Sequence, residues 1–129
     1  MTYSHHVNVR RVLIIDDNDD AAQLLSMFVS VLGNTASVAN SGASGLALAT
    51  IFQPDIVFLD LGMPGMSGYE VAPKLRQIAG LEKVYITALT GWGDAKTRQQ
   101  VIECGFDRHL VKPASIELIQ KILVSHPNP

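Results

Sequence analysis

The chain of 129 residues has a single cysteine, so no disulfide can form within it. One cysteine is typical of a protein in a reducing compartment, and we expect Cys104 to be a small buried apolar side chain. No apolar run approaches the roughly 18 residues that a membrane span needs. The N-terminal stretch MTYSHHVNVRR lacks the apolar region of a signal peptide. We therefore expect a cytoplasmic protein without a membrane segment.

The chain also lacks a large excess of either positive or negative charge. The chain has 10 basic and 12 acidic residues, a net charge of −2, and no long run of Lys and Arg. Nucleic-acid binding needs a concentrated basic face, so we expect no nucleic-acid partner. The length suits one domain, and 47% apolar residues suffice for a core. We expect this domain to cover residues 10–126, with flexible termini at 1–9 and 127–129.

Short apolar runs alternate along the chain with longer stretches of helical period. This alternation predicts five βα units and a parallel sheet covered on both faces. We expect a doubly wound α/β fold with five strands in the order 2-1-3-4-5, as in flavodoxin-like folds. The predicted strands cover residues 11–15, 35–39, 55–60, 83–89 and 107–111, and the predicted helices cover 19–32, 43–52, 68–79, 95–104 and 116–125.

Capping residues mark the starts of the predicted helices. Ser41, Asp94 and Ser115 each precede a helical stretch, and Ser67 with Glu70 forms a capping box. In the first helix, apolar side chains recur at helical spacing and predict a buried face made of Leu24, Leu25, Phe28, Val29 and Leu32. Pro73 lies inside the third helix and should bend it, without an evident functional reason.

Polar residues follow the predicted strands at their carboxyl ends. Asp16 and Asp17 follow the first strand and Asp60 ends the third, while Thr90 and Lys112 follow the fourth and fifth. In open α/β sheets these ends form the ligand site. We therefore expect all five side chains at one edge.

Three carboxylates in one small space do not all stay ionised without a partner. Mg²⁺ prefers oxygen ligands, so the sequence predicts a magnesium site there. The alternative is that Asp16 and Asp17 only cap the following helix. For Asp19 and Asp20 we favour that simpler role, as charges at a helix terminus. An EF-hand loop is excluded because its sixth position is Ala21 and not glycine.

A hydroxyl and an ammonium opposite a metal suit a phosphoryl group, whose charge must be neutralised on several sides. A carboxylate can be the nucleophile and give an aspartyl phosphate. Asp60 is the candidate because it stands alone after the central strand. Taken singly, Thr90 would be an ordinary strand-end residue and Lys112 a solvated charge; their joint arrival at one edge favours function.

Four motifs together resemble the receiver domain of two-component response regulators, over about residues 10–125. They are an acidic pair in DDND, an aspartate in FLDLGMPGMSGYEV, a hydroxyl residue in ALTGWG, and the Lys-Pro of LVKP. The local sequence is most similar to receivers attached to, or working with, hybrid sensor kinases. The resemblance implies that Asp60 is the phosphoacceptor. It also implies that Asp16, Asp17 and the backbone carbonyl of Gly62 hold Mg²⁺ with it.

The resemblance further implies that Thr90 is the switch hydroxyl and that Lys112 pairs with the phosphoryl group. The Lys112–Pro113 peptide is expected to be cis. His109 stands where the family has a switch aromatic. It would either replace that switch, with added pH sensitivity, or be a partly exposed strand residue. Trp92 would either shape access to the acceptor or be an ordinary loop side chain.

The implied function is phosphoryl transfer from a histidine kinase or a histidine phosphotransfer protein. The face made by residues 95–104, 107–111 and 116–125 would then change for partner signalling, as a monomer or a weak dimer through this face. The domain would assist its own phosphorylation and dephosphorylation and would not be a turnover enzyme. The chain would be a stand-alone receiver or one piece of a hybrid kinase, and the sequence leaves both open.

Three other functions fit the sequence less well. An aspartate-nucleophile phosphatase of the haloacid-dehalogenase type needs a second aspartate where this chain has Gly62. A flavin or nucleotide binder on the same fold needs a phosphate loop after the first strand, where DDND would repel phosphate. A pseudo-receiver that binds partners without phosphorylation is disfavoured because all five key residues are present.

Overall fold

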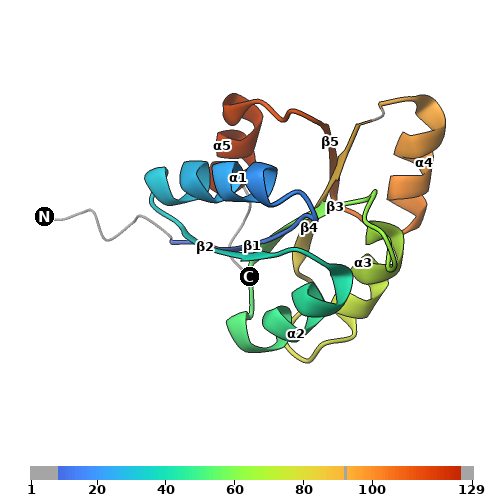
Figure 1. The fold of residues 1–129 in the computed structure, drawn as a ribbon, viewed down its shortest axis with the longest axis horizontal. Helices are drawn as coiled ribbons and strands as arrows, with labels where there is room; N and C mark the ends of the chain where they lie inside the picture. Colours follow the sequence, from blue (N-terminus) through green and yellow to red (C-terminus); the bar gives the residue numbers. More distant parts are fainter. Residues whose placement is uncertain (1–8, 92, 126–129) are drawn as a thin grey trace, which may run out of the picture.

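Figure 1 shows a central sheet with helices on both faces. This computed structural model describes residues 9–91 and 93–125. The predictions for residues 1–8, 126–129 and Trp92 fall outside the described residues. Within them, the parallel strands follow the order β2-β1-β3-β4-β5, which confirms the predicted topology. The strands are β1 (Arg11–Ile15), β2 (Thr35–Ala39), β3 (Ile56–Asp60), β4 (Tyr85–Thr90) and β5 (Arg108–Val111).

The helices divide between the two faces of the sheet. Alternate residues of β1 show the division: Val12 and Ile14 join one apolar cluster with α1 and α5, whereas Leu13 and Ile15 join another with α2, α3 and α4. Because both faces are covered, the strands are nearly continuous apolar runs. The helices are α1 (Asp19–Val31), α2 (Gly42–Phe52), α3 (Gly68–Arg76), α4 (Ala95–Glu103) and α5 (Ile116–Ser125).

The predicted caps lie at the helix starts. Ser41 and Ser115 accept backbone N–H groups at the starts of α2 and α5, and Asp94 accepts that of Thr97 at 2.8 Å in α4. Glu70 Oε1 accepts the Ser67 N–H at 3.0 Å. These contacts fix where the loops after β2, β3, β4 and β5 turn into helix.

Two predictions about α1 and α3 need correction. Leu24 is 52% exposed, because the core side of α1 centres on Ala22, Leu25 and Val29 and Leu24 lies outside that arc. Helix α3 ends at Arg76 and not at residue 79. The N–H of Gln77 bonds three residues back, to the Lys74 carbonyl, so the last turn tightens and the helix stops.

Strand β4 starts two residues later than predicted. Leu81 and Val84 are joined by a turn bond of 3.2 Å, and pairing with the region of β3 begins at Tyr85, whose N–H bonds to Asp55. The strand then runs through Thr90, which places this residue at the carboxyl edge. No helix of the described residues is long and apolar enough to cross a membrane.

Candidate phosphoacceptor site

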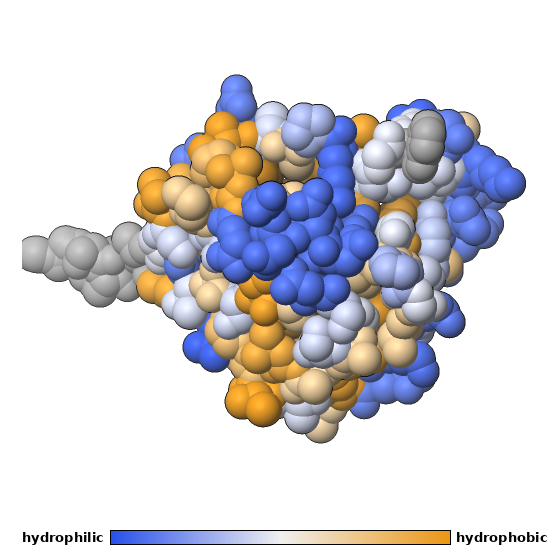
Figure 2. Space-filling view, in the orientation of Figure 1, coloured by the Kyte–Doolittle hydropathy of each residue, from blue (hydrophilic) through white to orange (hydrophobic). Residues whose placement is uncertain are grey.

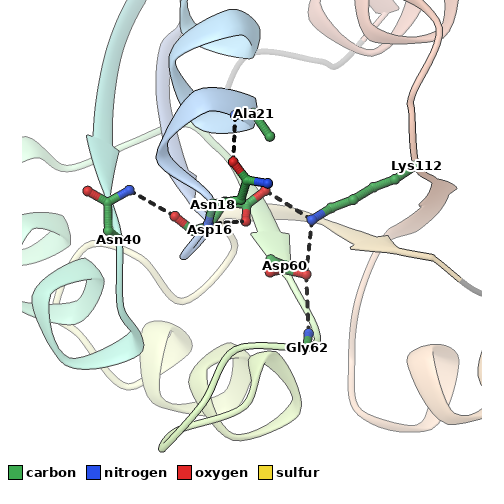
Figure 3. A network of polar contacts seen from close by, with 7 residues as sticks. All are labelled: Asp16, Asn18, Ala21, Asn40, Asp60, Gly62 and Lys112. Carbon is green, nitrogen blue, oxygen red and sulfur yellow. Dashed lines mark hydrogen bonds and ion pairs between the residues drawn. The ribbon is translucent and has the colours of Figure 1, made fainter.

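One ammonium group bridges two carboxylates at the carboxyl edge of the sheet (Figure 3). Asp16 follows β1, Asp60 ends β3 and Lys112 follows β5. Lys112 Nζ lies 3.0 Å from Asp16 Oδ2 and 3.3 Å from Asp60 Oδ1. The structure therefore joins three chain-distant residues that the sequence analysis placed at one edge.

A third carboxylate completes an acidic cluster. One oxygen each of Asp16, Asp17 and Asp60 lies within 4.8 Å of the others. Asp16 is 1% exposed and Asp60 6%, whereas Asp17 is open to solvent. Figure 2 shows the surrounding surface as a continuous hydrophilic patch over the start of α1. Three hard oxygen donors beside one ammonium fit a divalent cation such as Mg²⁺.

The electrostatics of the cluster show in the pKa of Asp60. Burial raises this pKa from its usual 3.8 to about 6, with the Gly62 N–H opposing the rise and the charge of Asp16 adding to it. Burial lowers the pKa of Lys112, but its bonds to Asp16 and Asp60 outweigh that effect and the net pKa is raised. Lys112 is thus a permanent cation, and one cation does not neutralise the cluster.

Two asparagines hold Asp16 in place. The Asn18 N–H donates to Asp16 Oδ1 at 3.0 Å, and Asn40 Nδ2 donates to the Asp16 carbonyl at 2.9 Å. Asn18 Oδ1 also accepts the Ala21 N–H and caps α1. The alternative that Asp16 and Asp17 serve as the helix cap is therefore wrong.

A cavity of about 260 Å³ opens over Asp60. Thr90, which is 5% exposed, forms part of its wall at the end of β4. The first turns of α3 and α4 supply the other side. The lining residues are Asp60, Leu61, Gly62, Tyr69, Thr90, Gly91 and Thr97. A phosphoryl group on Asp60 would thus meet the Thr90 hydroxyl, as predicted, and the side chains of Tyr69 and Thr97, which were not predicted from the sequence.

Backbone contacts tie the remaining predicted residues to the site. The Gly62 N–H donates to Asp60 Oδ1 at 3.2 Å, and the Lys112 N–H donates to the Thr90 carbonyl at 2.7 Å. The Lys112–Pro113 peptide is cis, as the resemblance implied. The role of the Gly62 carbonyl as a metal ligand stays a prediction.

His109 is not among the residues that line this cavity. It pairs in register with Ala88, and its Nε2 is buried without a hydrogen-bond partner among the described residues. Its roles as a switch and in pH sensing stay predictions. Cys104, expected to be buried, is partly buried and packs against the core.

Four residues that shape the site were not predicted from the sequence: Asn18, Asn40, Tyr69 and Thr97. Asn18 had a usable signal, because asparagine directly before a helical stretch is a preferred cap. The other three have none in the local sequence. Asn40 meets Asp16 across 24 residues of chain, and the two wall residues depend on how the helices pack.

Comparison with known proteins agrees with the fold and the site. The family model described as the response regulator receiver domain matches residues 12–124. The chain therefore belongs to the response regulator receiver domain family. This membership favours phosphoryl acceptance, the general function of the family, over a haloacid-dehalogenase phosphatase or a flavin binder.

Individual relatives span different lengths. The DNA-binding dual master transcriptional regulator RpaA of Synechocystis is 34% identical over 107 residues, which are 83% of this chain and 44% of that protein. An uncharacterized 14.6 kDa protein of Leptolyngbya boryana is 28% identical over an alignment that covers 90% of this chain and 92% of that protein. The solved chemotaxis protein CheY4 of Vibrio cholerae has a TM-score of 0.84 at 28% identity, with coverage of 90% and 97%. The chain thus spans less than half of RpaA.

Proposed function

We propose that Asp60 takes a phosphoryl group from a phosphohistidine of a histidine kinase or a histidine phosphotransfer protein. One observation carries this assignment. Asp60 alone of the three clustered carboxylates lines the cavity with Thr90, while its Oδ1 is held by Lys112 and the Gly62 N–H. The acceptor thus faces open space on one side and positive partners on the other.

The transfer is a displacement at phosphorus. A carboxylate oxygen of Asp60 forms the new O–P bond as the N–P bond of the donor breaks, and the electron pair stays on the imidazole nitrogen. Lys112 and the Thr90 hydroxyl neutralise charge on the phosphoryl oxygens. Later, water forms a new O–P bond, the bond to Asp60 breaks, and inorganic phosphate leaves. The domain assists both steps on itself, so we propose a switch and not a turnover enzyme.

Asp16, Asp17 and Asp60 would hold Mg²⁺ in the same site. When bound, the ion supplies positive charge against the phosphoryl oxygens. The chain's own part is to keep the Asp16 carboxylate fixed beside the acceptor, which the contacts of Asn18 and Asn40 to Asp16 achieve. Burial and, to a smaller extent, the charge of Asp16 raise the pKa of Asp60, and a bound cation would oppose that rise.

The donor would dock beside the acceptor edge. A groove of about 340 Å³ lies between α1 and the start of α5, lined mainly by apolar side chains including Leu24 and Phe28, with Asp16 and Lys112 also on its wall. The exposure of Leu24 suits contact with a partner. Figure 2 shows apolar surface on this side of the hydrophilic patch.

The output would pass through the face made by α4, β5 and α5. Helix α4 has only one buried side chain among its described residues, Val101, so little packing holds it in place. Ile102 and Val111 are exposed apolar residues on this face, at 74% and 45%. A monomer or a weak dimer through these residues remains our proposal.

Intact mass after incubation with Mg²⁺ and acetyl phosphate tests the proposed acceptor. We expect one added phosphoryl group on the wild type and on Asp20→Asn, a matched carboxylate loss outside the cluster, and none on Asp60→Asn. The fluorescence of the single tryptophan gives a second readout, and it should change only with Mg²⁺ present. An adduct on Asp60→Asn, or none on the wild type with either acetyl phosphate or a phosphohistidine protein, would contradict the assignment.

A further inference from the structure

The cavity over Asp60 is lined by residues with and without side chains. Gly62 and Gly91 leave space around them: a Cβ on Gly91 would meet nothing within 4 Å, and one on Gly62 would meet only Asp60 Oδ1 at 3.9 Å. Tyr69 and Thr97 come from the first turns of two helices. Among the described residues, these two therefore offer the side-chain bulk that limits access from the α3–α4 side.

Tyr69 is firmly anchored. It follows Gly68, where any Cβ would collide with the Asp60 carbonyl oxygen and come within 2.9 Å of Leu61 Cα. The start of α3 is therefore pressed against the backbone of the acceptor itself. The Tyr69 ring also packs edge-on against Phe106, with centroids 6.2 Å apart. Its position relative to Asp60 is set by backbone contact and ring packing together.

Thr97 stands on a less firmly held element. Its N–H is capped by Asp94 at 2.8 Å, which orders the first turn of α4. Val101 is the only buried side chain of that helix among the described residues. A small force on Thr97 can therefore shift the start of α4, whereas a force on Tyr69 meets a packed element.

We propose that Tyr69 and Thr97 form a gate over the acceptor that sets the lifetime of the phosphoryl group. The proposal rests on the proposed function, in which Asp60 carries that group. Tyr69 is the fixed half, and its ring blocks water by bulk. Thr97 is the moving half. Its hydroxyl exchanges its hydrogen bond to Asp94 for one to a phosphoryl oxygen, which draws the start of α4 toward Asp60 and closes the gate.

The chemistry of hydrolysis explains why Tyr69 and Thr97 would affect the lifetime of the phosphoryl group. In hydrolysis, the water oxygen attacks phosphorus opposite the O–P bond to Asp60, that bond breaks, and its electron pair returns to the carboxylate. Lys112, Asp16 and Asp17 crowd the other side of Asp60. The attacking water therefore comes through the cavity, where Tyr69 and Thr97 narrow its approach from the side of α3 and α4.

The test compares lifetimes of the purified phosphoryl adduct after the donor is removed, followed by intact mass. We expect Tyr69→Ala to lose the adduct about tenfold faster, and Tyr69→Phe to stay within about twofold of wild type because bulk is kept. Thr97→Val keeps the shape and the bond of its N–H to Asp94 but loses the hydroxyl. It should lose the adduct about threefold faster, whereas Thr97→Ser, which keeps the hydroxyl, should not. Thr50→Val, a matched hydroxyl loss on α2, should match wild type.

Two controls separate the gate from other causes. In denaturant all variants should lose the adduct at one rate, because the bare acyl phosphate is the same. Hydrogen exchange of the first α4 turn should slow on phosphorylation of the wild type and not of Thr97→Val. Equal lifetimes in all folded variants would overturn the gate while leaving the acceptor intact. A rate for Tyr69→Phe equal to that of Tyr69→Ala would overturn blocking by bulk. Absence of any wild-type adduct would instead contradict the proposed function.

Discussion

The amino and carboxyl ends of the sheet both carry charged side chains, and they use them differently. At the amino end, Arg76 donates to the carbonyls of Val84 and Gly105 at 2.7 and 2.8 Å and to Asp107 at 2.9 Å. Asp107 also accepts the Ile86 N–H at 2.8 Å. Each charge there has partners of opposite polarity, and the contacts tie α3 to the starts of β4 and β5.

The carboxyl end has three clustered carboxylates against one ammonium among the described residues. Burial raises the pKa of Asp60 to about 6, and the charge of Asp16 adds to this rise. Charged residues by themselves therefore do not mark a reactive site, because Arg76 and Asp107 are also held by hydrogen bonds and stabilise the fold. What marks the site is charge that the protein leaves without a full set of partners.

Removing the cation at the carboxyl end should have the largest effect. Lys112→Met should slow phosphorylation about 100-fold, because the phosphoryl oxygens lose a charged partner. The same change should tighten Mg²⁺ binding several-fold, because an ammonium no longer repels the ion. Phosphorylation rates and calorimetric Mg²⁺ titration measure both. Lys74→Met, an exposed lysine of α3, should leave both unchanged; looser Mg²⁺ binding by Lys112→Met would refute the imbalance.

Removing the cation at the amino end should change stability and not chemistry. Arg76→Ala should lower the free energy of unfolding by about 2 kcal/mol, because a part-buried carbonyl, an exposed one and Asp107 lose a charged donor. Urea unfolding measures this cost, and phosphorylation well below the melting temperature should match wild type. The exposed Arg98→Ala should cost less than about 0.5 kcal/mol. Loss of phosphorylation in folded Arg76→Ala would show that the two ends are not separate in function.

A smaller effect concerns pH. The pKa of Asp60 is raised from 3.8 to about 6 on folding. Between pH 3.8 and about pH 6, the Asp60 carboxyl is therefore mostly protonated in the native state and mostly ionised in the unfolded state. The unfolding free energy should therefore rise as pH falls from about 7 to about 5, by about 1 kcal/mol from this group. Thermal melts without Mg²⁺ measure it. Saturating Mg²⁺ or Asp60→Asn should flatten this part of the profile, and an unchanged slope in Asp60→Asn would assign it elsewhere.

The sequence allowed the prediction of what depends on local pattern. The strand order, the caps and the meeting of Asp16, Asp60 and Lys112 follow from periodicity and from the rule that parallel strands end at one edge. Where local pattern competes with packing, prediction failed. Leu24 has the spacing of a core residue but lies toward the groove beside α1.

The wall of the acceptor cavity could not be predicted for the same reason. Tyr69 and Thr97 belong to separate helices, and nothing in GYEV or DAKT shows that their first turns face one cavity. The collision that a Cβ on Gly68 would cause with Asp60 is likewise a contact between elements. Such features follow from how the helices dock on the sheet.

The most direct test of a buried acceptor beside a metal site is the titration of the Asp60 carboxyl carbon by NMR, assigned with Asp60→Asn, with and without Mg²⁺. We predict a midpoint near the pKa of about 6 without the ion, well above the usual 3.8, and a clear shift to lower pH when the ion is added. A midpoint at the usual value that Mg²⁺ does not move would contradict the account.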